Sequence, residues 1–223
     1  RHYVGSNHSH KTFVEKYHFL NAIYYLIVSN QQILKTNLLE ASKTPDSVIG
    51  VVTHAISKTQ FQGVFVPAND AREMAQDFDS FLNVLQHQVI ATAYRYFVDY
   101  CMDLLEEVVS YRGCALPEKL DTRLSERFMN LDHIKSAFIG ELDVSFYFEP
   151  TYESRLNFLL ATRNSIEHAD SKATKEYLRL TGSSLSIGDP IPAGSKEVGD
   201  ALSLVEHLAN NLNTTCLKNW KIS

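Results

Sequence analysis

One ten-residue stretch of the chain combines the side chains that proton transfer and phosphate binding require. Residues 161–170 read ATRNSIEHAD, so an arginine, an asparagine and a histidine stand close together. An imidazole titrates near neutral pH and can move a proton, whereas a guanidinium stays charged and holds phosphate oxygens through paired N–H groups. The candidates for chemistry are therefore Arg163, Asn164 and His168.

A predicted helix that follows Pro150, with Thr151 as a suitable N-cap, positions these residues. One row at four-residue steps contains Leu156, Leu160, Asn164 and His168. Such steps keep residues on one side of a helix, and Arg163 lies about 100° round the helix from Asn164. We expect the two polar residues to extend a row that faces the core. Because buried polar groups need partners, this placement indicates either internal pairing or a cleft at an interface.

An ordinary structural role explains the same residues. Glu167 stands four residues after Arg163 and could form an ion pair with it. A histidine near the end of a helix interacts favourably with the helix dipole. Spacing alone favours this structural interpretation.

Other motifs give no competing chemistry. The sequence contains no P-loop, GxGxxG, HExxH or GxSxG pattern. Asp132 and His133 form an isolated pair, and His8 and His10 are interpreted as surface residues of the terminus. We expect no metal site and no cofactor.

Apolar residues recur at helical spacing along most of the chain. Helices are expected over 12–35, from a capping box at Asp70–Glu73 to about residue 112, around 121–129 and 131–141, from 151 through the ATRNSIEHAD stretch, over 172–180, and from about 195 to 216. The long helix after Asp70 could bend or form a hairpin. A short helix is expected through 48–56, an irregular or extended piece at 60–67, a connector at 144–150 and a loop at 181–195. The prediction is an all-α antiparallel bundle in a single domain, residues 1–223, with 1–11 a flexible terminus or a remnant of cloning.

Composition limits the classes of protein to consider. A formal charge of −5 excludes a generally basic nucleic-acid coat, so any polyanion site must be local. Three widely spaced cysteines provide no disulfide framework and point to a reducing cytoplasm. The longest apolar run, residues 19–28, falls short of the roughly 20 residues of a membrane span, and we expect no membrane partner.

The stretch from Arg163 to His168 resembles the R-x4-6-H motif of HEPN domains, a superfamily of helical domains. In that family a polar residue commonly follows the arginine, and here this residue is Asn164. The leucine-rich lead-in RLNFLLATRN, long preceding helices and a helix after the motif agree with the resemblance. The match by motif covers about residues 151–220, and the chain exceeds a minimal HEPN core, so extra helices are expected.

This resemblance implies a function. Many HEPN proteins are metal-independent endoribonucleases whose homodimers bring two motifs into one cleft, and they act as toxins or anti-phage effectors. Such proteins are commonly restrained by a partner, often an antitoxin nucleotidyltransferase. RNA cleavage by the ribose 2′-OH needs a proton acceptor, a proton donor and stabilisation of charge on the phosphate. By resemblance His168 transfers protons, Arg163 holds phosphate oxygens, and Asn164 orients the histidine or donates to the phosphate.

A basic stripe follows the motif. Lys172, Lys175 and Arg179 would share one face of a helical segment and could hold an RNA backbone. With Glu176 among them, they also fit a solvated helix face. The alternative function is a catalytically inactive HEPN-like module that binds a protein or a nucleotide.

Overall fold

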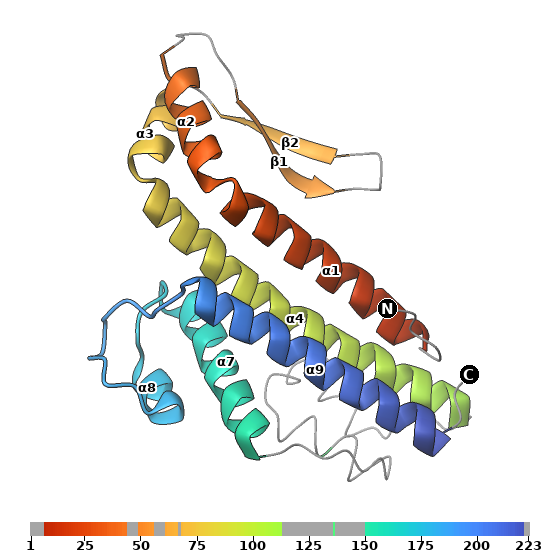
Figure 1. The fold of residues 1–223 in the computed structure, drawn as a ribbon. Helices are drawn as coiled ribbons and strands as arrows, with labels where there is room; N and C mark the ends of the chain where they lie inside the picture. The colour runs from red at the N-terminus through yellow and green to blue at the C-terminus, as the bar shows by residue number, and fades with distance from the viewer. Residues whose placement is uncertain are drawn as a thin grey trace. The chain divides into compact units, whose positions relative to one another are not determined.

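Helices account for most of the chain, as the apolar periodicity predicts (Figure 1). The structure, a computed structural model, describes residues 7–43, 49–55, 61–66, 68–112, 136 and 150–220. The elements in chain order are α1 (His8–Ser29), α2 (Gln31–Ala41), β1 (Ile49–Ala55), β2 (Phe61–Val66), α3 (Ala68–Gln76), α4 (Phe78–Arg112), α7 (Pro150–His168), α8 (Lys175–Thr181) and α9 (Ser195–Trp220). The fold class is all-α, and the described residues include a two-stranded hairpin.

The chain divides into two units, Arg1–Asn21 with Gln86–Ser223, and Ala22–Leu85. Both boundaries fall inside continuous helices, α1 and α4. Because each of these helices contributes to both units, the expected single domain stays a prediction.

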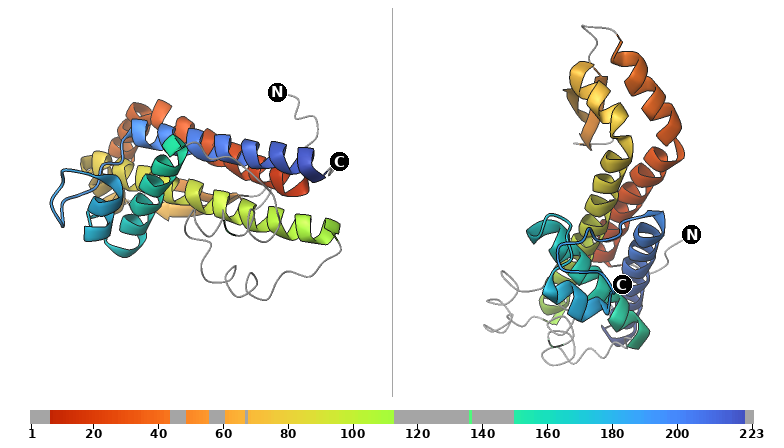
Figure 2. Two further views of the ribbon diagram at one scale, coloured as in Figure 1. Left: turned by 90° about the horizontal axis from the view of Figure 1, so that it is seen from below. Right: turned by 90° about the vertical axis from the view of Figure 1, so that its left-hand side faces the viewer.

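The larger unit is a helical bundle in which α4 and α9 run in the same direction (Figures 1 and 2). The Tyr100 hydroxyl of α4 donates to the carbonyl oxygen of Ala209 in α9 at 3.3 Å. α1 runs the opposite way along α9, with His10 Nε2 3.0 Å from Asn210 Oδ1. α7 is also antiparallel to α9, since the ring of Tyr152 stacks on His207, and Arg155 reaches Asp200.

The core of this unit consists of the rows that the sequence predicts. In α9 the residues Val198, Leu202, Val205, Leu208, Leu212 and Cys216 are all buried. In α4 the buried members of the predicted row include Val89, Ala93, Phe97, Cys101, Leu104 and Val108. A face that repeats at three- and four-residue steps packs continuously against its neighbours, which explains why the long helices are predictable.

Of residues 1–11, which are expected to be a flexible or foreign terminus, residues 8–11 form the start of α1. His10 is 1% exposed, and its backbone N–H donates to Asn7 Oδ1 at 2.8 Å, an N-cap bond. The Glu107 carboxylate of α4 accepts from the backbone N–H groups of His8 at 3.1 Å and Ser9 at 3.0 Å, and from the Ser9 hydroxyl. A carboxylate at a helix N-terminus is stabilising, and it anchors α1 to α4.

The segment between α7 and α9 packs against the end of α7. Thr174 caps α8 by accepting from the Tyr177 backbone N–H at 3.0 Å, and Gly182 ends α8 in the left-handed conformation. A small cluster buries Ala161, Ala173, Tyr177 and Ile191. The expected helix over 172–180 therefore begins only at Lys175, because Thr174 supplies the cap.

The smaller unit contains α2, the hairpin and α3. β1 and β2 pair antiparallel, with Ile49 opposite Val66 and a register irregularity between Val52 and His54. Within this unit Arg72 of α3 donates to the carbonyl oxygen of Ser42 at 3.1 Å.

Three expectations in this region are wrong. The short helix over 48–56 is strand β1, whose β-branched residues favour extended backbone. The helix over 12–35 breaks at Asn30, whose side-chain amide donates to the Leu26 carbonyl oxygen at 2.7 Å and competes with the helical ladder. The capping box expected at Asp70–Glu73 does not start the helix, which begins at Ala68. The long stretch is expected to bend, and it is interrupted at Asp77, between α3 and α4.

The expected helices around 121–129 and 131–141, the 144–149 connector and Cys114 lie outside the described residues, residue 136 excepted. Within the described ranges none of the helices has the length and apolar character to cross a bilayer.

Candidate functional site

α7 carries the candidate residues and ends on the last of them, His168. Leu156 is 1% exposed and Leu160 is buried, whereas Asn164 is half-buried and the His168 side chain is 68% exposed. Each four-residue step turns a helical row by about 40°, so three steps carry His168 about 120° from Leu156. The expectation that His168 faces the core is therefore wrong within the single chain.

Arg163 is largely enclosed. Its side chain is 13% exposed and forms an ion pair with Glu167 one turn on. Its Nη1 also donates to Asn164 Oδ1 at 3.0 Å. Burial raises the pKa of Tyr94 on α4, and the positive charge of Arg163 opposes this shift. The structure thus confirms the Arg163–Glu167 pair that the structural interpretation predicts.

Glu167 joins the candidates into one polar tract. Its Oε2 contacts Arg163 and lies 3.9 Å from His168 Nε2. We call Arg163, Asn164, Glu167 and His168 the α7 polar tract. Spacing identified Glu167 only as an ion-pair partner of Arg163, because its distance to His168 depends on rotamers.

The residues of the basic stripe do not share one helical face. Lys172 precedes α8 in an isolated β-bridge with Pro190, and its Nζ lies 3.2 Å from Asp170 Oδ2. Arg179 holds Glu176 through two N–H groups, with Nε 2.9 Å from Oε2. Lys175 is exposed at the first position of α8. The three side chains are solvent-exposed, and their binding of RNA stays a prediction.

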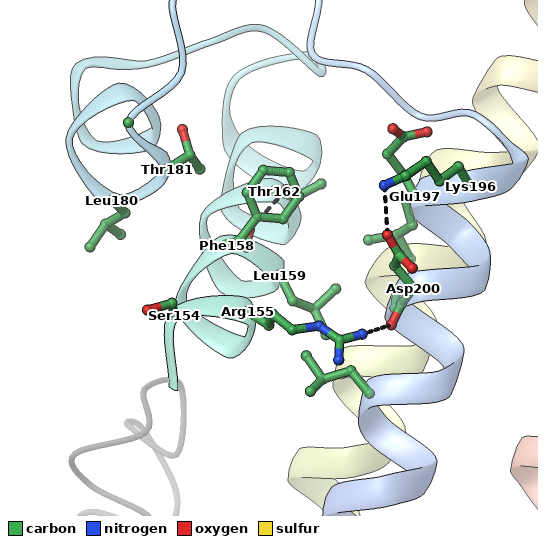
Figure 3. A pocket seen from close by; sticks show the side chains of 14 residues that line it. Ser154, Arg155, Phe158, Leu159, Thr162, Leu180, Thr181, Lys196, Glu197 and Asp200 are labelled. Carbon is green, nitrogen blue, oxygen red and sulfur yellow. Dashed lines mark hydrogen bonds and ion pairs between the residues drawn. The ribbon is translucent and has the colours of Figure 1, made fainter. Parts of the chain in front are cut away.

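A cavity of about 530 Å³ lies between α7 and α9 and reaches Ile90 of α4 (Figure 3). Arg155, Phe158 and Thr162 line it from α7, Lys196 and Asp200 from α9, and Thr181 and Gly182 from the end of α8. None of the residues of the α7 polar tract lines it. The sequence offers no signal for this cavity, because its walls come from segments far apart in the chain.

Among the residues that the structure describes, no group of three His, Cys, Asp or Glu side chains could hold a metal ion. The expectation of a metal-independent site stays a prediction.

Searches against protein-family models, curated proteins and solved structures found no match for this chain. The resemblance to HEPN domains therefore rests on the motif and on the all-α fold.

Proposed function

We propose that the protein is a metal-independent endoribonuclease of the HEPN kind, acting as a homodimer in which two α7 polar tracts form one cleft. The observation that carries the proposal is that Arg163 and His168 both lie beside Glu167 Oε2 at the end of α7, with His168 open to solvent. A proton-transfer group must reach the substrate, and an exposed imidazole beside a guanidinium meets that need.

His168 exchanges protons with the ribose 2′-OH or with the leaving 5′-oxygen, and the His168 of a second copy takes the other role. Arg163 stabilises the negative charge that builds on the phosphate oxygens. Asn164, which accepts a hydrogen bond from Arg163, fixes the direction of the guanidinium. The substrate is RNA, because the attacking group is the 2′-OH that DNA lacks.

Glu167 competes with phosphate for the Arg163 guanidinium. Its carboxylate already occupies the Arg163 guanidinium. A phosphate that binds Arg163 must displace Glu167 or share the guanidinium with it. Without a ligand, the chain therefore has a low affinity for phosphate at Arg163. This is consistent with an effector whose activity is released only by a partner or a substrate.

The same ion pair favours the second candidate function, a catalytically inactive module that binds a protein or a nucleotide. In that case Arg163 and Glu167 have a structural role, and His168 is a surface residue that contacts the partner. Under the ribonuclease proposal, by contrast, the partner is an antitoxin, such as a nucleotidyltransferase, that restrains the activity.

Cleavage of a mixed RNA pool in the presence of a chelator separates the two functions. The native protein should cleave, and His168→Ala should lose at least about 100-fold in rate, the usual contribution of a general acid or base. His18→Ala, another exposed histidine, is the matched control and should cleave like the native protein. A folded, dimeric native protein that cleaves none of the pool would favour the binding module.

A further inference from the structure

The cavity between α7 and α9 has the composition of a small-molecule site. Its floor is apolar, formed by Ile90, Phe158, Leu159, Ala201 and Leu204. Its volume of about 530 Å³ falls within the roughly 300–1,000 Å³ of typical ligand sites. Phe158 is 36% exposed, so part of its ring is available to a ligand.

Charged side chains stand at one side of the cavity, on α7 and α9 (Figure 3). Lys196 Nζ lies 2.9 Å from Asp200 Oδ2, and Glu197 Oε2 accepts from the Gly194 backbone N–H at 2.9 Å. Both carboxylates are therefore already engaged. Figure 3 shows Arg155 extending from α7 toward Asp200 of α9.

The Arg155 guanidinium has N–H donors available for a ligand. Its Nη2 donates to the carbonyl oxygen of Asp200 at 3.3 Å, and its guanidinium lies 5.9 Å from the centre of the Tyr152 ring. Within the described ranges no carboxylate forms an ion pair with it. A guanidinium carries five N–H donors, so most of those on Arg155 remain for a ligand, and the Lys196 ammonium lies nearby.

We propose that this cavity binds a small organic anion with a flat apolar body. The carboxylate or phosphate of the ligand is held by Arg155, with Lys196 as a second cation, and its apolar body lies against Phe158 and the floor. Forked hydrogen bonds from a guanidinium suit both anions. The site does not depend on the proposed ribonuclease function, because it shares no residue with the α7 polar tract.

Calorimetric titration of the full chain tests the charge requirement. The probes are naphthoate, naphthyl phosphate and the uncharged naphthylmethanol, which share one aromatic body. At least one anion should bind with a dissociation constant of about 0.1–1 mM, as expected for a ligand of this size, and about tenfold more tightly than the alcohol. Preference for one anion over the other would identify the headgroup.

Variants test the residues. Arg155→Gln should weaken binding of the preferred anion about tenfold and leave binding of the alcohol unchanged. Arg95→Gln, an exposed arginine of α4 that does not line the cavity, is the control and should change neither. Ser154→Trp, at an exposed position of the lining, should block all three probes while the thermal unfolding temperature is maintained.

Backbone amide correlation spectra locate the probe. Shifts at Phe158, Ala201 and neighbouring residues would support the proposal. Shifts confined to the exposed apolar residues Phe19, Ile23 and Leu26 of α1 would overturn it. Equal affinity for anion and alcohol, or no binding by the folded native protein at millimolar probe, would also overturn it.

Discussion

Arg163 has two roles that compete for the same donors. It binds Glu167 and Asn164 within α7, which stabilises the end of the helix, and in the proposed reaction it binds a phosphate. The Glu167 carboxylate and the phosphate are both anions that bind the Arg163 guanidinium, so the phosphate would have to displace the carboxylate. The balance between the two roles can be shifted by a single substitution.

Glu167→Gln should strengthen RNA binding and weaken the fold. Removing one negative charge beside the phosphate site is worth about 1 kcal/mol, or about fivefold in affinity. The free energy of unfolding should fall by about 1 kcal/mol, because Arg163 keeps a neutral hydrogen-bond partner but loses the ion pair. Fluorescence anisotropy with labelled RNA, and chemical denaturation, measure the two effects.

Glu176→Gln is the matched control for the stability measurement, since it removes the same charge from the exposed pair with Arg179. It should leave stability unchanged. Unchanged or weaker RNA binding by a folded Glu167→Gln protein would show that Glu167 does not compete with phosphate.

At the scale of elements, two residues just after the end of α7 have an unusual backbone conformation. Asp170 and Ser171 have φ angles of 51° and 57°, and the Ser171 N–H donates to the carbonyl oxygen of Ser165 at 3.0 Å. Residues other than glycine adopt this left-handed conformation at a cost of about 1 kcal/mol each. These two residues, two and three positions after His168, lie just beyond the end of the α7 polar tract.

Ser171→Gly should raise the free energy of unfolding by up to about 1 kcal/mol, because glycine adopts a positive φ without strain. Ser203→Gly is the control, an exposed position in the middle of α9, and should lower it by about 0.5–1 kcal/mol. Thermal unfolding measures both. Destabilisation by Ser171→Gly would mean that the serine side chain outweighs the strain of its backbone.

Long elements could be predicted from the sequence, and their interruptions could not. The apolar row of α9 predicts its buried face residue by residue, since a periodic face must pack against a core. Asn30 ends α1 through one local hydrogen bond that competes with good helical periodicity. His168 lies outside the core because residues at four-residue steps turn progressively around a helix. The cavity depends on tertiary packing, so no local pattern reveals it.

At the scale of the whole molecule, a buried histidine links stability to pH. Burial lowers the pKa of His10 below its usual 6.5, and a hydrogen bond from its ring to Asn210 opposes the shift. Among the described residues, the rings of Tyr100 and Phe13 lie beside it. Burial therefore makes the folded chain take up the His10 proton at a lower pH than the unfolded chain does.

The sign of the pH dependence follows from this difference. Below pH 6.5 the unfolded chain binds the His10 proton more readily, so stability should fall as the pH is lowered from 7 to 5. Denaturation curves across this range should show a steeper loss for the native protein than for His10→Gln, which retains a hydrogen-bonding side chain. Equal slopes would show that His10 is not responsible.

The proposed activity belongs to the dimer, and the chemistry of its products tests it most directly. End-labelled RNA is incubated with the native protein and with His168→Ala in the presence of a chelator, and the new ends are identified. Attack by the ribose 2′-OH predicts cyclic phosphate ends from the native protein and none from His168→Ala. Cleavage by His168→Ala at the native rate, or products that carry 3′-hydroxyl ends, would contradict the proposed mechanism.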